Sequence, residues 1–184
     1  LRQIAAQGSK GFYQSDITID LVNSLKELGG VHTLADFENV NVQYVDPIYA
    51  DLRDGSTLIE LPPNGQGITA IMMKKLMEFC NIERFNAGSY ERVHLEAEIA
   101  KIAYSARNNF IGDSNFSEIK QNIFLDESYL KQYSREICLG NLLSDSLEDS
   151  FFTQNKDTVL ICAADNIGNA ISLIFSTFHA FGSG

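Results

Sequence analysis

The sequence predicts an α+β fold, and three observations support this prediction. Between residues 16 and 110, apolar residues recur at helical spacing in several segments. A stretch near residues 43–61 alternates apolar and polar residues as a strand does. The chain then closes on two apolar runs joined by a turn at "DNIGN". With 184 residues, 45% of them hydrophobic, the chain is long enough for one domain with a sizeable core.

Two helices are expected in the N-terminal part of the chain. The segment "QSDITIDLVNSLKELGG" carries an apolar stripe made of Ile17, Leu21, Leu25 and Leu28. Ser15 is placed to cap the start of this helix, and Gly29 to end it, because glycine accepts the left-handed conformation found there. In "HTLADFENV", Thr33 and Asp36 have the spacing of a capping box, which predicts a second, short helix.

Extended structure is expected next, in "VQYVDPIYADLRDGSTLIELPP". Ile48, Ala50 and Leu52 alternate with polar or amphipathic neighbours, and the "DG" at 54–55 is a turn signal. The loop "PPNGQG" at 62–67 lacks the Lys-Ser/Thr ending of a phosphate loop, so no nucleotide site is expected there. A helix is predicted behind this loop, with one face formed by Ile68, Met72, Leu76 and Phe79.

The segment "SYERVHLEAEIAKIAYSARNNFIGD" gives the strongest helix signal in the chain. It carries two apolar stripes, Val93, Ala97, Ala100 and Tyr104 on one and Leu95, Ile99, Ile102 and Ala106 on the other. Stripes this wide predict burial over much of the helix surface. Residues 114–156 are expected to form a helix-poor, acidic connecting segment, and residues 156–184 an apolar hairpin.

Charge and hydropathy exclude several classes of protein. The net charge is −10 and Lys and Arg do not cluster, which argues against a nucleic-acid binder. The chain has no apolar run of about 18 residues, so no transmembrane helix is expected. It begins without an initiator Met and without the apolar stretch of a signal peptide. We therefore expect an internal piece of a longer protein, and a cytoplasmic location in preference to a secreted one.

The cysteine and histidine spacings argue against a metal centre or a disulfide framework. The cysteines are odd in number and far apart, which favours buried free thiols at Cys80, Cys138 and Cys162. The histidines are too scattered in sequence for a metal site, namely His32, His94 and His179. Glu96 and Glu98 lie two apart on a helix, so they point to different faces and cannot act as a paired acid and base. No metal and no organic cofactor is expected.

Thr158 is the residue whose place in the sequence best suits a catalytic nucleophile. It opens the apolar run "TVLICAAD" directly after the polar "SFFTQNKD" at 150–157. A threonine hydroxyl becomes a useful nucleophile when the residue's own α-amino group takes its proton, which requires cleavage of the preceding peptide bond. A threonine at a strand start is more often just a good β-former, so this residue alone leaves both interpretations open.

Five segments, in order along nearly the whole chain, resemble the γ-glutamyltranspeptidase family of N-terminal nucleophile hydrolases. "GFYQSDI" is similar to the family's Phe-Tyr-x-Gly-x-Ile, and "LGGVHTLADF" to its Gly-Gly-x-x-Thr-x-x-Asp-Leu. "LPPNGQG" resembles a Pro-Pro-x-x-x-Gly loop of acylase-like members, and "EIAKIAYSARNNFIGD" a Glu-Ala-x-Lys-x-Ala-x-x-Asp-Arg-x-x-x-x-Gly-Asp helix. "DTVLICAADNIGNAISLIFSTFHAFGSG" resembles the segment that spans the family's self-cleavage site.

The resemblance implies roles for individual residues. The family's nucleophile lies seven positions before a strand-end Asp, here Asp165, so Thr158 is the implied nucleophile and Asp157–Thr158 the implied self-cleavage bond. The α-amino group of Thr158 would serve as the base. A hydroxyl residue 18 positions after the nucleophile orients it in the family, and here that residue is Ser176. The implied hairpin turn consists of Asp165, Gly168 and Asn169.

The chain also departs from the family pattern. Val159 and Leu160 replace the second Thr and the His that usually follow the nucleophile, and Ala106 replaces the usual Asp before Arg107. Phe178 replaces an asparagine that helps to hold the α-amino group of a glutamyl substrate. A pocket without that polar group loses discrimination for γ-glutamyl compounds, so Phe178 points towards the cephalosporin-acylase-like branch.

The resemblance implies a fragment of a four-layer αββα sandwich. Residues 1–157 would form the mostly helical C-terminal part of the large subunit, and residues 158–184 the first core hairpin of the small subunit. The implied partners are a small γ-glutamyl or acyl-amide substrate and the remainder of both subunits, which would supply the carboxylate-binding arginine and the oxyanion hole. Two alternatives stay open: an amidase without glutamyl specificity, and a catalytically inactive homologue with a structural or binding role.

Overall fold

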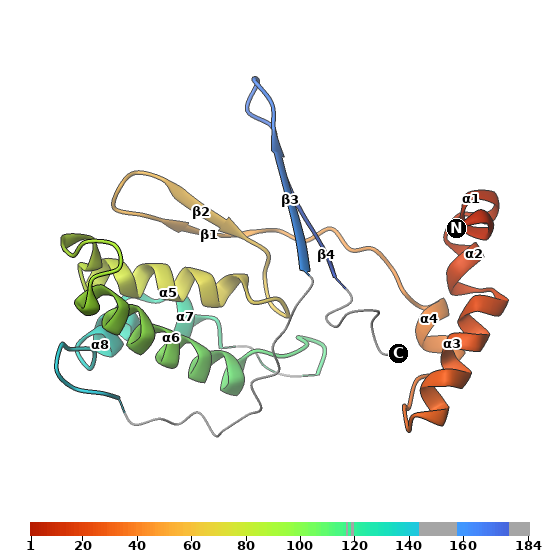
Figure 1. Ribbon diagram of the computed structural model, residues 1–184, viewed down its shortest axis with the longest axis horizontal. Coiled ribbons are helices and arrows are strands. Elements are labelled where there is room, and N and C mark those ends of the chain that lie inside the picture. Colours follow the sequence, from red (N-terminus) through yellow and green to blue (C-terminus); the bar gives the residue numbers. More distant parts are fainter. Residues whose placement is uncertain (117, 119, 144–157, 177–184) are drawn as a thin grey trace. The chain divides into compact units, whose positions relative to one another are not determined.

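The computed structural model describes residues 1–116, 118, 120–143 and 158–176. The chain divides into two units, one of Leu1–Gln43 with Phe151–Gly184 and the other of Tyr44–Ser150. Figure 1 shows helices and two-stranded sheets in the mixture that the sequence predicts for an α+β fold. The described helices include none that is long and apolar enough to span a membrane.

Four helices, α1 (Arg2–Gln7), α2 (Lys10–Tyr13), α3 (Asp16–Glu27) and α4 (Leu34–Glu38), follow one another in the N-terminal segment. The Ser15 side chain caps α3 by accepting a hydrogen bond from the Ile17 N–H, as predicted. Gly29 follows α3 with φ of 87°, in the left-handed region. The Asp36 carboxylate accepts hydrogen bonds from the Thr33 N–H and hydroxyl, so the predicted capping box is present at α4.

The buried face of α3 differs from the predicted one. Thr18 and Val22 are its buried residues, whereas Leu28 of the predicted stripe is 71% exposed and the other stripe members are half-buried. Thr18 can be buried because its hydroxyl donates to the carbonyl of Phe12. The helix was therefore predicted correctly, but its packing face is rotated by one residue.

In the second unit, β1 (Ile48–Asp51) and β2 (Thr57–Glu60) form the predicted antiparallel hairpin, with Ile48 opposite Glu60. Gly55 adopts φ of 84° in the turn, where a side chain would be strained. The "PPNGQG" loop then leads into α5 (Gly67–Phe79). A Cβ at Gly67 would lie 2.7 Å from the Cβ of Glu60, so glycine is needed for this close approach of helix and strand.

The core of the second unit lies between α5 and α6 (Tyr90–Phe110), with a short 3-10 turn, η1 (Ile82–Arg84), between them. Its buried side chains include Ile68, Met72 and Leu76, three of the four predicted on α5. From α6 it takes Leu95, Ile99 and Ala106, on one of the two predicted stripes. The other stripe is open, because Val93 is 54% exposed and Ala97 and Tyr104 are also exposed. The expectation of burial around most of this helix is wrong.

The structure corrects the expectation that residues 114–156 are helix-poor. Helices α7 (Asn122–Leu125) and α8 (Glu127–Ser134) lie in this region and both contact α5 (Figure 1). Phe124, Leu130 and Ile137 are buried in the core. Asp126 caps α8 by accepting from the Ser128 and Tyr129 N–H groups. The region therefore closes the core of the second unit.

The last two strands, β3 (Thr158–Ala164) and β4 (Ala170–Ser176), form the predicted apolar hairpin. They pair antiparallel in a continuous register from Thr158–Ser176 to Ala164–Ala170. The exposed large apolar residues of this hairpin include Val159, Leu160, Ile161, Ile171, Leu173, Ile174 and Phe175.

Candidate active site

The β3–β4 turn is held by one carboxylate. Asp165 Oδ1 accepts hydrogen bonds from the N–H groups of Ile167 at 3.0 Å and Asn169 at 2.9 Å. Its Oδ2 accepts from Asn169 Nδ2 at 2.7 Å. These hydrogen bonds, first of all those from Asn169, hold the pKa of Asp165 below its ordinary value. Gly168 adopts φ of 93°, so the three residues implied for the turn do form it.

This turn fixes the register of the hairpin, and the register places Thr158 directly opposite Ser176. Both residues lie at the open end of the hairpin, as the first residue of β3 and the last of β4. The self-cleavage partner Asp157 and the pocket residue Phe178 lie outside the described residues. The structure thus brings together the positions of the implied nucleophile and of the residue implied to orient it.

The two faces of the hairpin differ in chemistry. Strand alternation puts the positions of Thr158 and Ser176 on one face, together with Cys162 and Ser172. The opposite face carries only apolar residues, namely Val159, Ile161, Ala163, Ile171, Leu173 and Phe175. The Thr, Ser and Cys positions of the hairpin therefore share one face.

The cysteines are free, as predicted, but only one of them is shielded from solvent. Cys80 is half-buried, and burial raises the pKa of its thiol. Cys138 and Cys162 are exposed, which contradicts the expectation of buried thiols. Cys162 is exposed because it lies on the C-terminal hairpin, which is open to solvent in this chain. Its Sγ lies 3.7 Å from Ser172 Oγ.

His94 and Arg107 each contact a residue far away in the sequence. His94 Nε2 lies 3.1 Å from the carbonyl oxygen of Cys138. Arg107, which lacks the family's neighbouring Asp, donates from Nη1 to Gln66 Oε1 at 2.9 Å and lies over the Tyr104 ring. Among the residues that the structure describes, His, Cys, Asp and Glu do not gather in a group of three or more that could hold a metal ion.

A second polar cluster lies in the Tyr44–Ser150 unit, and sequence reasoning missed it. Glu98 is only 2% exposed, and its Oε2 accepts a hydrogen bond from the Leu143 N–H at 2.8 Å. Its Oε1 accepts from Lys101 Nζ at 2.9 Å. The only sequence signal was a charged residue on the apolar side of α6, one position before the core residue Ile99.

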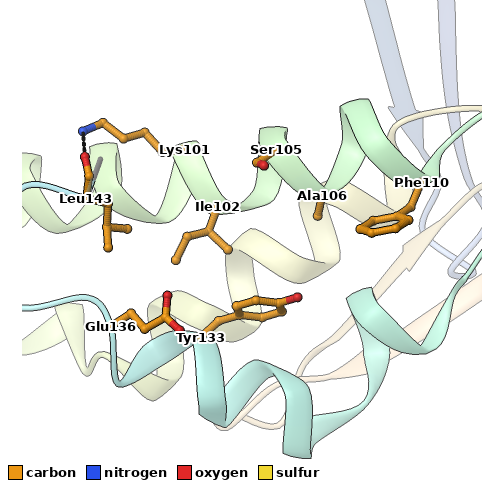
Figure 2. A pocket seen from close by; sticks show the side chains of 8 residues that line it. All are labelled: Lys101, Ile102, Ser105, Ala106, Phe110, Tyr133, Glu136 and Leu143. Atoms are coloured by element: carbon orange, nitrogen blue, oxygen red, sulfur yellow. Dashed lines mark hydrogen bonds between the residues drawn. The ribbon is translucent and has the colours of Figure 1, made fainter. Parts of the chain in front are cut away.

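A pocket of about 240 Å³ opens beside this cluster. Figure 2 shows Lys101, Leu143 and Glu136 at one end, Phe110 at the other, and Tyr133 of α8 across from Ile102 of α6. Its lining is part apolar and part charged. All of its lining residues belong to the second unit, and the hairpin residues that carry the implied chemistry belong to the first.

The fold and the hairpin together are those of a fragment of an N-terminal nucleophile hydrolase. Among solved structures, the γ-glutamyltranspeptidase of Helicobacter pylori is 26% identical, with a TM-score of 0.68 over 79% of this chain and 42% of that chain. The γ-glutamyltranspeptidase of Pseudomonas nitroreducens matches with the same TM-score at 23% identity, which supports the fold alone. These likenesses confirm the predicted fold class.

The sequence model of the γ-glutamyltranspeptidase family matches residues 1–184, and the chain belongs to this family. The glutathione hydrolase-like YwrD proenzyme of Bacillus subtilis is 30% identical over the whole of this chain, which spans 34% of that protein. The acylase ACY 1 proenzyme of Pseudomonas sp. strain V22 is 26% identical over the whole chain and 33% of its own length. The chain therefore corresponds to about a third of the curated relatives that it matches.

Proposed function

We propose that this chain belongs to a self-processing threonine hydrolase or transferase that cleaves a γ-glutamyl or similar acyl amide through an acyl-enzyme on Thr158. The observation that carries the proposal is the register of the C-terminal hairpin, which sets Thr158 opposite Ser176 in a member of this family. Directly opposed positions of an antiparallel pair lie on one face with Cβ atoms about 4.5–5.5 Å apart. A hydroxyl at Ser176 is thus placed to orient one at Thr158.

The first step is maturation. The Thr158 hydroxyl attacks the carbonyl carbon of Asp157, the Asp157–Thr158 amide bond breaks, and an ester forms while the nitrogen of Thr158 becomes a free amine. Water then hydrolyses the ester, which leaves a carboxyl group on Asp157 and restores the threonine hydroxyl. Under this proposal, residues 1–157 end the large subunit and residues 158–184 begin the small one. Relatives named as proenzymes support a precursor of this kind.

The second step uses the new N-terminus. The α-amino group of Thr158 accepts the proton of its own hydroxyl, which attacks the carbonyl of the substrate amide and releases the amine. Ser176 holds the hydroxyl, and backbone N–H groups from the rest of the protein stabilise the oxyanion. Water or a second amine takes the acyl group. The substrate and the remainder of both subunits are the partners that this chemistry needs.

The second candidate is an amidase without glutamyl preference. Phe178 favours it, because an apolar ring stands where the family's asparagine holds a substrate amino group. The 26% identical relatives named acylase ACY 1 proenzymes favour it as well. This candidate shares the acyl-enzyme on Thr158 and differs only in the acyl group.

Two anilides that differ only in the α-amino group separate the candidates. We would compare hydrolysis of γ-glutamyl and glutaryl 4-nitroanilide by the purified full-length protein. A γ-glutamyl enzyme prefers the first, whereas an acylase accepts both or prefers the second. Phe178→Asn should shift kcat/KM towards the γ-glutamyl anilide by about ten- to a hundredfold. Thr158→Ala should abolish both activities, and activity that survives in this variant would rule out the nucleophile assignment.

A further inference from the structure

The loop between β2 and α5 carries an Asn-Gly pair, Asn64–Gly65, in the segment "PPNGQG". Asparagine is one of the thermolabile side chains of proteins. The main-chain nitrogen of the residue that follows it can attack its side-chain carbonyl carbon. Glycine hinders this attack least, because it has no Cβ and its backbone is permissive. The freedom of the two reacting groups then decides whether the pair reacts in the folded chain.

Both reacting groups of the Asn64–Gly65 pair are free. The two residues are exposed. Within the part of the chain that the structure describes, neither the Gly65 N–H nor the Asn64 side chain has a hydrogen-bond partner. A Cβ added to Gly65 would come within 4 Å of the Pro62 carbonyl oxygen alone, at 3.8 Å, so the space around this glycine is open. The nitrogen of Gly65 can therefore approach the side chain of Asn64 without the loss of a hydrogen bond.

The β1–β2 turn offers a contrast within the same unit. Its Asp54–Gly55 pair is open to the same ring closure, but its groups are held. The Gly55 N–H donates to the carbonyl of Leu52 at 3.1 Å. Asp54 Oδ1 accepts from the Ser56 N–H at 3.0 Å and from the Ser56 hydroxyl at 2.6 Å. Ring closure in this turn must first break these hydrogen bonds, whereas ring closure at Asn64 breaks none.

We propose that Asn64 is a site of spontaneous deamidation, which converts the loop before α5 into aspartate and isoaspartate forms. The Gly65 nitrogen loses its proton to water and bonds to Cγ of Asn64, the bond from Cγ to Nδ2 breaks, and ammonia leaves. Water then opens the resulting succinimide ring. Opening at Cγ leaves an aspartate, and opening at the main-chain carbonyl leaves an isoaspartate. This modification does not depend on the chemistry proposed for Thr158.

The two products should affect α5 differently. The aspartate adds a negative charge two residues before Gln66, the N-cap of α5, and negative charge near a helix N-terminus is stabilising. Arg107 Nη1 donates to Gln66 Oε1 at 2.9 Å, so a cation also lies beside this loop. The isoaspartate instead lengthens the main chain by one atom. It should disturb the start of α5, where a Cβ on Gly67 would lie only 2.7 Å from the Cβ of Glu60.

The test follows the amide of Asn64 by peptide mapping and mass spectrometry while the full-length protein is incubated at neutral and mildly alkaline pH. We expect deamidation at Asn64, faster at the higher pH because the attacking nitrogen must lose its proton. Asp54→Asn places the same pair in the β1–β2 turn, and position 54 should react about tenfold more slowly than Asn64, since hydrogen bonds must break first. Gly65→Ala, whose added Cβ fits at 3.8 Å, should slow the reaction at Asn64 about tenfold.

A synthetic peptide with the sequence "LPPNGQGITA" supplies the rate of the unfolded loop. Asn64 in the full-length protein should react within several-fold of this peptide, and this comparison decides if Asp54→Asn does not fold. An intact Asn64 in the protein, beside a peptide that deamidates, would overturn the proposal. Equal rates at positions 54 and 64 of Asp54→Asn would also overturn it, because the freedom of the loop would then not select the site.

Discussion

The Glu98 and Asp165 carboxylates show how differently one functional group is used in this chain. Asp165 is exposed, and its carboxylate accepts hydrogen bonds within a local turn, from partners two and four residues away. Glu98 is buried and binds a main-chain N–H that is 45 residues away. The first arrangement can be read from a short sequence pattern. The second cannot, because its partner is a backbone group whose position depends on the whole fold of the second unit.

The Glu98 carboxyl gives a prediction about pH. Its pKa is lowered from an ordinary value of 4.5 in the folded chain, so its contribution to stability is fully present above that value. The contribution is lost as the pH falls through the lower folded pKa. In a carbon-detected NMR titration, we expect the Glu98 side chain to change charge below pH 4.5. Glu98→Gln should lose less stability than the wild type on acidification over this range. A Glu98 midpoint above its ordinary value would mean that burial outweighs the hydrogen bonds from the Leu143 N–H and Lys101, and would contradict this prediction.

At the scale of elements, local signals predicted most of what the structure contains. Ser15 and Thr33 mark helix starts, and the "DG" at 54–55 marks a turn, because each acts on residues within one turn of itself. Helices α7 and α8 were not predicted, because they have four and eight residues, too few to show a helical period of apolar residues. Asp126 before Glu127 was the available signal for α8, as a cap followed by an acidic first turn.

The faces of the helices were less predictable than the helices themselves. On α6 the sequence offers two apolar stripes, and only packing against α5 decides which of them is buried. We expect Ile99→Ala, at a position with no exposure, to lower the free energy of unfolding by about 2 to 5 kcal/mol. Val93→Ala on the open stripe should change it by less than about 0.5 kcal/mol. Urea denaturation of this chain measures both.

Equal losses from the Ile99 and Val93 substitutions would contradict one-sided burial of α6. The two variants make a matched pair, because each replaces a β-branched side chain by alanine on the same helix. The gain in helix propensity from alanine is then similar in both, and the difference between them reports burial.

At the scale of the whole molecule, the C-terminal hairpin is apolar on a face that the described residues leave open. Leu173 is 54% and Phe175 is 74% exposed in a chain that spans about a third of its relatives. Exposed apolar strands favour association with other chains. We expect the 184-residue chain to self-associate in light scattering, and Leu173→Lys to reduce this association.

Ser172→Lys is the matched control, since it adds the same charge on the neighbouring position of β4 but on the face of Thr158 and Ser176. It should reduce association less, because it removes no large apolar side chain. If the two variants behave alike, net charge and not the apolar face governs association.

The candidate site was predictable in part. The turn residues and the pairing of two strands follow from the sequence around Asp165 and Asn169, whereas the register of the pairing comes from the structure. The roles of Thr158, Ser176 and Phe178 rest on family resemblance and stay predictions. The hydrogen bonds of Glu98 to the Leu143 N–H and to Lys101 were not predicted, because the sequence analysis considered Glu98 only beside Glu96.

The central claim is that Thr158 cuts the chain before itself and then serves as the nucleophile. The most direct test is an intact mass spectrum of the full-length protein after purification and overnight incubation, beside its Thr158→Ala variant. We predict two fragments in the wild type, the second beginning at Thr158, and one uncut chain in the variant. A single uncut mass in both would contradict the claim and leave Thr158 as an ordinary strand residue.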